Sequence, residues 1–318
     1  MVTRIYANAV ARYNEGKLLD GEKLNRLIDA EFSDAVKMLC DYGYGGGTAD
    51  EKSYDIDAFI SRETAALIDY VISSAPNEYV ARVLINGFLY GNAKAYYKAR
   101  VSGKENPAAV FEMQDEEIKA AVYKGDYAAL PEPMADALER LDSMFTEQKP
   151  NPKTIDIMLS KARFADSIEC AKKAKDKSLV KYAVSEIDLA NVLSALRARA
   201  LGMSEASFAE LFIEGGKLDY DEALAVFKAD DAVKALQNTE YDFIADNAET
   251  LSLPHAEAKT SEYLAEIWER KADDMRSLSP FAGYFLAQMR EYKTVKLILA
   301  CLKNGARSEI YPRLYKGA

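Results

Sequence analysis

Few residues in this chain could carry out chemistry. His255 is the only histidine, so an H-E-x-x-H zinc site is impossible, and a Ser-His-Asp or Cys-His arrangement would have to use this one residue. It follows Pro254 at an expected helix start, where a surface or capping histidine is far more common than a catalytic one. We therefore expect no catalytic centre, no cofactor and no metal.

The remaining reactive or charged groups have simpler interpretations. The glycines between Gly43 and Gly47 lack the Gly-Lys-Ser/Thr ending of a P-loop and are interpreted as a helix C-cap and mobile loop. Neighbouring acids point in different directions on a helix, so we expect solvated faces at Asp115-Glu116-Glu117 and Asp273-Asp274. The cysteines are far apart, without a C-x-x-C pair, and are predicted to be buried thiols: Cys40, Cys170 and Cys301.

One compact basic cluster contains Lys172, Lys173, Lys175 and Lys177 on an expected helix. It could meet an acidic partner or anionic lipid headgroups, although a solubilising helix face is the more common role.

The strongest pattern is a motif that occurs three times, about 100 residues apart, in Asn92 to Gly103, Asn191 to Gly202 and Thr294 to Gly305. Positions one, four and five after its first residue are apolar in every copy, which is the spacing of one helix face. Position seven is always small, and the final glycine suits the left-handed conformation that ends a helix. Each copy is therefore predicted to be the last turns of a buried helix.

These helices also carry polar residues that a pure core helix does not need. They brace the core, or they line a central cavity as a threefold set of partner-binding groups, and the sequence gives the two hypotheses equal weight. The residues are Asn92, Lys94, Lys98, Arg100, Asn191, Arg197, Arg199 and Lys296.

The composition fits a globular protein with a large core. The chain has 318 residues, 49% of them hydrophobic and 29% charged. A net charge of −10 argues against general nucleic-acid binding and favours a partner with basic loops. No run of about 18 uncharged apolar residues is present, so we expect an intracellular protein that does not cross a membrane.

Almost every segment reads as helix, so we predict an all-α fold. Ser261 to Leu278 places Leu264, Ile267, Trp268, Met275 and Leu278 on one stripe. Ser279 is the expected N-cap of the next helix, with Pro280 at its first position.

A fainter repeat indicates how the units are joined. Gly16 to Tyr42 resembles Gly216 to Tyr241: both begin Gly-Lys-Leu and later contain Asp-Ala-Val-Lys-x-Leu. In the middle of the chain this element begins 14 residues after the motif glycine, whereas only 13 residues follow Gly305. Residues 1–42 are therefore predicted to complete the third unit. The hypothesis is one helical body, 1–318, of three pseudo-symmetric units of about 100 residues, 43–125, 126–215 and 216–318, closed into a funnel or socket.

The sequence resembles a known family. Tyr6 to Leu19, Ser160 to Arg199 and Ser279 to Leu314 closely resemble the C subunit of archaeal and bacterial A/V-type ATPases, whose eukaryotic vacuolar counterpart is the d subunit. The chain departs from the threefold acidic-x-x-Asn pattern at Thr294, where the other copies have asparagine, and at Leu89, where they have Asp188 and Glu291. Equivalent binding by the three units is therefore not expected.

The resemblance implies a non-catalytic funnel on the cytoplasmic face of the membrane rotor ring, holding the foot of the central shaft, subunits D and F. Such a protein transmits torque between ATP turnover and H⁺ or Na⁺ transport. The competing hypothesis is a helical-repeat adaptor or scaffold unrelated to the ATPase.

Overall fold

The computed structural model describes residues 2–104, 114–147, 149–237, 239–246, 251–311 and 314. All regular secondary structure in these residues is helical, which confirms the all-α prediction. The α-helices are α1 (Arg4–Glu15), α2 (Gly21–Asp29), α3 (Phe32–Asp41), α4 (Ile56–Ser74), α5 (Glu78–Ser102), α6 (Asp115–Lys124), α7 (Glu132–Glu147), α8 (Pro152–Lys173), α9 (Lys177–Ala200), α10 (Glu205–Ala209), α11 (Tyr220–Lys228), α12 (Ala232–Leu236), α13 (Leu253–Glu269) and α14 (Ser279–Lys303). Short 3₁₀ turns are η1 (Tyr44–Gly47), η2 (Glu51–Tyr54), η3 (Asp242–Ala245) and η4 (Arg307–Glu309).

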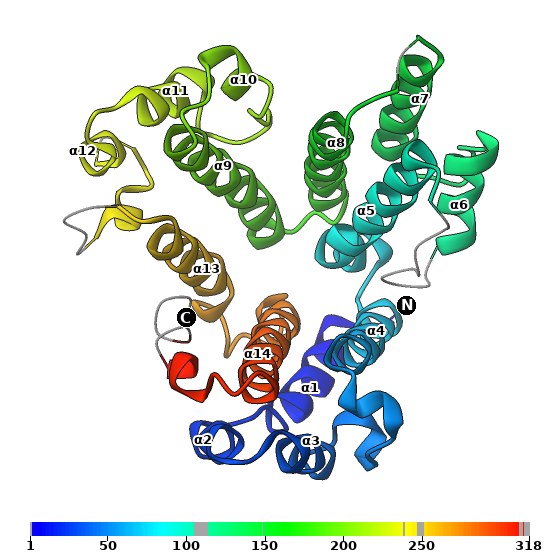
Figure 1. Cartoon of the computed structure of the whole chain (residues 1–318), viewed down its shortest axis with the longest axis vertical. Coiled ribbons are helices and arrows are strands. Elements are labelled where there is room, and N and C mark those ends of the chain that lie inside the picture. The colour runs from blue at the N-terminus through cyan, green and yellow to red at the C-terminus, as the bar shows by residue number, and fades with distance from the viewer. Residues whose placement is uncertain are drawn as a thin grey trace. The chain divides into compact units, whose positions relative to one another are not determined.

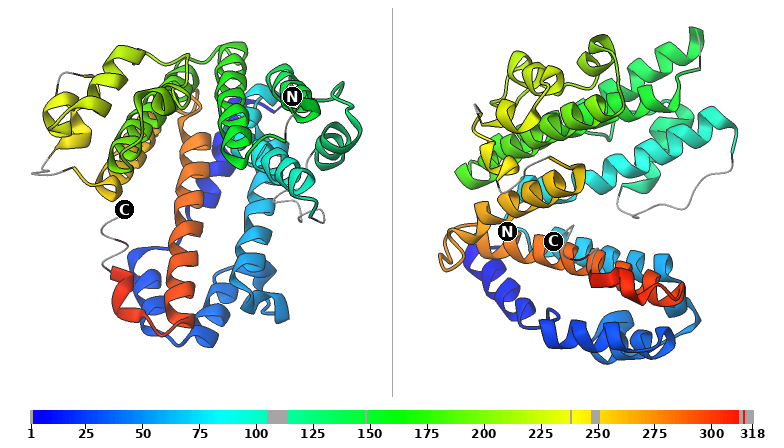
Figure 2. Two further views of the ribbon diagram at one scale, coloured as in Figure 1. Left: turned by 45° about the horizontal axis from the view of Figure 1, so that its top comes forward. Right: turned by 60° about the vertical axis from the view of Figure 1, so that its left-hand side comes forward.

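The chain forms two compact units. Unit 1 comprises Met1–Glu78 and Ser261–Ala318, and unit 2 comprises Tyr79–Thr260. In unit 1, α14 packs against α1 and α4 along its length and also contacts α2 and α3; Figure 2 shows α14 in orange beside α4 in light blue. The two ends of the chain therefore share one core.

Aromatic side chains fill much of unit 1. Tyr70 of α4 meets Tyr284 of α14 edge to face, with ring centroids 5.6 Å apart. Tyr44 in the turn η1 meets Tyr292 in the same way at 5.8 Å. Edge-to-face contacts of this kind add to the energy of burying the rings, so α4, η1 and α14 are held together.

In unit 2, α8 lies between α7 and α9, and α11 covers α9 (Figure 1). The helix α8 begins with Asn151, whose side chain caps Thr154 N, followed by proline at the first helical position. It remains regular to Lys173, and the next helix begins after Lys175, which adopts a positive φ of 54°. The basic cluster predicted on one helix therefore spans the α8–α9 turn.

The three motif copies are the last turns of α5, α9 and α14, as predicted. All twelve positions one, four, five and seven of the motif are buried: Ala93, Tyr96, Tyr97, Ala99, Val192, Ala195, Leu196, Ala198, Val295, Ile298, Leu299 and Cys301. The final glycines Gly103, Gly202 and Gly305 have φ of 66°, 61° and 68°. A residue without Cβ adopts this conformation at little cost, so it ends each helix.

Several local predictions are wrong. The helix expected from Ser261 to Leu278 is α13, which begins earlier and ends at Glu269 because turns occupy the next residues. The N-cap of α14 is Leu278, and the hydroxyl of Ser279 is buried without a hydrogen-bond partner among the described residues. Asp115 does not lie on a solvated face: it is 8% exposed and accepts a hydrogen bond from Tyr96, since α6 packs that side chain inward.

The predicted buried thiols are confirmed, since Cys40, Cys170 and Cys301 are all buried. The glycine cluster after α3 begins with Gly43 at φ of 105° and continues as the turn η1, in which Gly45 N donates to Glu63 at 2.7 Å. It is therefore a tight turn held by a side chain of α4.

Candidate partner-binding site

Seven of the eight polar residues singled out on the motif helices contact other parts of their own unit. Lys94 donates to Ser160 at 2.7 Å, Arg100 to Asp142 and Val122 O at 2.6 Å each, and Arg199 to Asp230 O at 2.5 Å. Asn191 exchanges two hydrogen bonds with the backbone of Ile213 at 2.8 and 2.9 Å, and Asn92 is fully buried. Lys98, Arg197 and Lys296 form ion pairs. The role of the eight in partner binding stays a prediction.

The three ion pairs recur with the repeat. Lys98 meets Asp156 of α8 at 2.6 Å, Arg197 meets Glu257 of α13 at 2.5 Å, and Lys296 meets Asp57 of α4 at 2.6 Å. The three acids lie about 100 residues apart, each near the start of its own helix, α8, α13 and α4 respectively. The cationic side chains are 37%, 51% and 53% exposed. These pairs are therefore accessible to a partner, whereas Asn92 and Asn191 are fully buried.

A polar seam joins α5 to α8. Its α5 residues are four apart, Arg82, Asn86, Tyr90, Lys94 and Lys98, and so share one helix face. Arg82 lies 3.5 Å from the Asp166 carboxylate, Asn86 donates to Ser167 at 3.2 Å, and Tyr90 donates to Asp166 at 3.4 Å. The first three of these residues were not predicted from the sequence, although their four-residue spacing was a usable signal.

Burial sets the ionisation of this seam. Desolvation raises the pKa of Asp166, against the opposing effect of the Arg82 guanidinium. Desolvation also lowers the pKa of Lys94, which lies near Arg163 and Lys98. Removing one partner from such a network leaves a buried polar or charged group unsatisfied, which is costly. The seam therefore holds α5 in a fixed position against α8.

Cys170 beside the seam is expected to resist alkylation in the folded protein. Burial, with Asp166 accepting from its thiol at 3.3 Å, raises the pKa of Cys170 to about 12. Its reaction with iodoacetamide at pH 8 should therefore be roughly a thousandfold slower than that of an exposed thiol, because the thiolate is the nucleophile. Pulse alkylation and peptide mass spectrometry measure this rate, and urea-unfolded protein is the control. A native rate near that of the control would contradict the prediction.

Asp188 of α9 holds the segment that leads into α11. Its carboxylate accepts from Lys217 N at 3.1 Å, from Leu218 N at 2.9 Å and from the Tyr241 hydroxyl. It is fully buried, and a Cβ on Gly216 would lie 1.9 Å from its Oδ1. The side chain and the glycine therefore fit only as a pair.

In unit 1, Glu291 of α14 is the counterpart of Asp188. It accepts from Leu19 N at 2.5 Å and from the Tyr44 hydroxyl at 2.6 Å. Tyr44 and Tyr241 each follow an Asp-Ala-Val-Lys-x-Leu element by the same number of residues. The first motif copy has the buried Leu89 at this position and cannot make the same contact.

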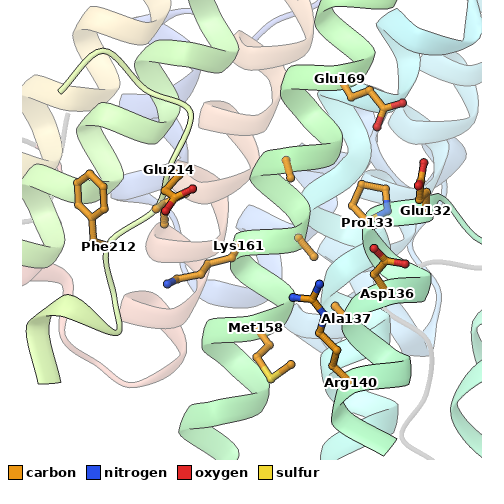
Figure 3. Close-up of a pocket in the computed structure, with 13 residues that line it drawn as sticks. Glu132, Pro133, Asp136, Ala137, Arg140, Met158, Lys161, Glu169, Phe212 and Glu214 are labelled. Atoms are coloured by element: carbon orange, nitrogen blue, oxygen red, sulfur yellow. The ribbon is translucent and has the colours of Figure 1, made fainter. Parts of the chain in front are cut away.

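Two hollows flank α8. One of about 530 Å³ lies between α7, α8 and the segment from Phe212 to Glu214; the other, of about 330 Å³, lies between α8 and α9. Ile213 lines both, and Asn191 holds its backbone. In Figure 3, Lys161 extends toward the segment with Phe212 and Glu214, and Arg140 reaches from α7 toward α8. In the described part of the chain neither cation has an ion-pair partner. The larger hollow could therefore hold a charged segment of a partner.

Two further properties of the described residues bear on other functions. None of their helices is long and apolar enough to span a bilayer. They contain no group of three His, Cys, Asp or Glu side chains placed to hold a metal ion. His255 lies at the start of α13, as expected, with its Nε2 buried and unpaired among these residues.

Comparison with known proteins identifies the family. The family described as ATP synthase (C/AC39) subunit matches residues 7–313. The chain belongs to this family. Relatives in it include the C subunit of the V-type ATP synthase of Thermus thermophilus, 24% identical over 67% of each chain. The C subunit of the A-type ATP synthase of Desulfurococcus sp. is 25% identical over 96% of this chain and 88% of its own. The C subunit of the V-type sodium ATPase of Enterococcus hirae is 18% identical over 93% of each.

Membership in the ATP synthase (C/AC39) subunit family decides between the two hypotheses drawn from the sequence. The matched residues include all three motif helices, the three recurring ion pairs, and Asp188 and Glu291 with the partners described above. The chain is thus a subunit of a V/A-type ATPase, and the hypothesis of an unrelated helical scaffold is wrong.

Proposed function

We propose that this protein is a non-catalytic part of the central stalk. It would sit peripherally on the cytoplasmic side of the membrane, bind the shaft subunits D and F on one side and the rotor ring on the other, and transmit torque between ATP turnover and H⁺ or Na⁺ transport. The observation that carries the proposal is the family match over residues 7–313.

The recurring ion pairs support a threefold, closed arrangement of repeat units. Each joins a motif helix to a second helix, and the third pair joins Lys296 near the chain's end to Asp57 near its start. A closed set of units resists twisting better than an open array, whose end repeats contact only one neighbour. We therefore propose the units 43–125, 126–215 and 216–318, with residues 1–42 completing the last, as the socket that takes the shaft.

Bracing inside each unit supports a torque-bearing role. A protein that transmits rotation must not yield, and buried carboxylates that accept several hydrogen bonds lock neighbouring segments in one geometry. The buried Asp188 in unit 2 and the half-buried Glu291 in unit 1 each accept such bonds at matching positions of the repeat.

Binding to the shaft and the ring tests the proposal. The purified chain should co-elute with D and F and with the detergent-solubilised ring at low salt. Binding should weaken as salt rises, because exposed charges fix the register of such contacts. If the chain binds neither the shaft nor the ring at low salt, the coupling role is wrong.

A set of variants tests the contact residues. Replacing Lys98, Arg197 and Lys296 together by alanine should weaken this binding by about tenfold, a loss that a few charged contacts can account for. The matched control replaces Arg26, Lys37 and Arg270, whose side chains are at least 60% exposed. Arg26 and Lys37 pair with acids on their own helices, and Arg270, in the turn after α13, pairs with Glu266 of that helix. Equal effects of both triple variants would rule out a specific role for the recurring pairs.

A further inference from the structure

The helix α1 has its apolar residues on the wrong side for a helix that only packs on its own unit. Its buried residues are the small or polar Ala7, Asn8 and Ala11. Its largest apolar side chains face outward: Ile5 is 59% exposed, Tyr6 61% and Tyr13 70%. A surface helix normally shows the opposite pattern, with large apolar residues on its packed face.

The outward residues form one continuous stripe. Ile5, Ala9 and Tyr13 are four residues apart, so they lie above one another on the helix, with Tyr6 beside the first. All four are exposed. We call this surface the α1 stripe.

Chance exposure of single hydrophobic residues does not explain the α1 stripe. Among the described residues, eight large hydrophobic side chains are exposed, and three of them lie on this one helix of 12 residues. Scattered apolar residues need no explanation, whereas a contiguous group marks an interaction site. Tyrosine is also enriched in binding surfaces, because its ring is large and its hydroxyl remains polar.

Lys17 marks one end of the stripe. It lies one turn beyond Tyr13, with its ammonium 4.4 Å from the Tyr13 ring centroid and 3.2 Å from Asn14 Oδ1. No carboxylate of the described residues pairs with it. An apolar stripe that ends in a cation without an acidic partner is complementary to an apolar surface flanked by an acid.

We propose that the α1 stripe binds an apolar helical segment of another protein, with a carboxylate of that segment opposite Lys17. This proposal deepens the proposed function and rests on it only in that the partner is another subunit of the same complex. Three turns of α1 offer a ridge that fits the groove of a facing helix.

Charge disfavours two other occupants. Packing the stripe on a second copy of itself would bring Lys17 against Lys17 or against Arg4, depending on direction, and like charges repel. An anionic membrane surface would meet the exposed carboxylates of Asp20 and Glu22 just beyond the stripe and of Asp273 beside Arg12. These acids are repelled by anionic headgroups.

Photo-cross-linking in the assembled complex identifies the occupant. A photoreactive amino acid in place of Ala9, in the middle of the stripe, should cross-link to one apolar peptide that contains an acidic residue. The same residue in place of Leu201, which is 76% exposed in unit 2, is the control and should give a different product. Cross-links from position 9 to lipid, to a second copy of the chain or to no protein would overturn the proposal.

Variants test the energetics. The double variant Tyr6→Ser/Tyr13→Ser should weaken binding of the cross-linked partner by at least about tenfold, since buried tyrosines are frequent hot spots. Its melting temperature should match the parent, because both rings are exposed; Leu201→Ser should change neither quantity. Lys17→Glu should also weaken binding, and reversing the partner's acid to lysine should restore it. Unchanged binding by the tyrosine variant would sink the proposal.

The two proposals can fail separately. If the wild-type chain binds neither shaft nor ring while position 9 still cross-links to another protein of the complex, the coupling role is wrong and the stripe remains a docking surface. If shaft and ring bind the tyrosine variant as tightly as the parent and position 9 gives no protein cross-link, the α1 stripe is not a docking surface, while the coupling role stands.

Discussion

Replacing Asp188 by alanine is expected to lower the free energy of unfolding of unit 2 by about 3–6 kcal/mol. The carboxylate accepts three hydrogen bonds, from two backbone amides and the Tyr241 hydroxyl. Removing it leaves these donors without their partner in a buried site, and an unsatisfied buried donor costs about 1–3 kcal/mol. Urea denaturation measures the loss, and hydrogen exchange should show that the amides of Lys217 and Leu218 lose protection first.

A double-mutant cycle with Gly216 is the control for this prediction. Gly216→Ala alone should destabilise the protein, because its Cβ would overlap Asp188 Oδ1. In the Asp188→Ala background the overlap is gone, so most of that cost should disappear and the cycle should give a large coupling energy. If Gly216→Ala costs the same in both backgrounds, Asp188 is not what requires glycine there.

Local patterns in the sequence were sufficient to predict most of the fold. Helix periodicity and a glycine at each end placed the motif on α5, α9 and α14, because burial and helix termination depend on residues close together in sequence. The same reasoning failed at α13, where the apolar stripe continued past Glu269 into turns. Periodicity alone does not mark the end of a helix when no glycine follows it.

The contacts that cross-link each unit could not be predicted in this way. Asp115 follows a loop and looks like a member of an acidic run, yet Tyr96 of another helix draws it into the core. Asn8 lies in an ordinary helix sequence, yet it bonds residues more than 260 positions away. Partners so far apart leave no local trace in one sequence.

Some of the candidate site was within reach. The acids Asp57, Asp156 and Glu257 recur about 100 residues apart, at the interval of the motif itself. Extending the repeat from the motif helices to the helices beside them would have paired these acids with Lys296, Lys98 and Arg197. The sequence pointed to the cations but did not identify their partners, because three single acids among 51 Asp and Glu residues are a weak signal.

Removing residues 1–42 is expected to unfold unit 1 while unit 2 stays folded. The deletion takes away α1, α2 and α3, all of which contact α14, together with the amide that Glu291 binds. It also removes nine buried apolar residues: Ala7, Ala11, Leu19, Leu27, Ile28, Ala35, Val36, Leu39 and Cys40. Burial of a large aliphatic side chain contributes about 1.5–3 kcal/mol to stability. The stabilisation lost with these residues is therefore comparable to the whole free energy of unfolding of a typical domain, about 5–15 kcal/mol.

A point variant separates this effect from the general cost of truncation. Asn8 is fully buried, donates to Met275 O and Ser277 O at 2.8 and 2.9 Å, and accepts from Phe281 N at 3.2 Å. Asn8→Ala should therefore cost unit 1 about 3 kcal/mol, since the buried Phe281 amide and two part-buried carbonyls lose a partner. Hydrogen exchange followed peptide by peptide should show that the deletion and Asn8→Ala each lower amide protection in α4 and α14. Neither change should lower protection in α8 and α9. A truncated chain that melts like the full one would mean that the N-terminal helices do not complete the last unit, and the closed socket would have to be abandoned.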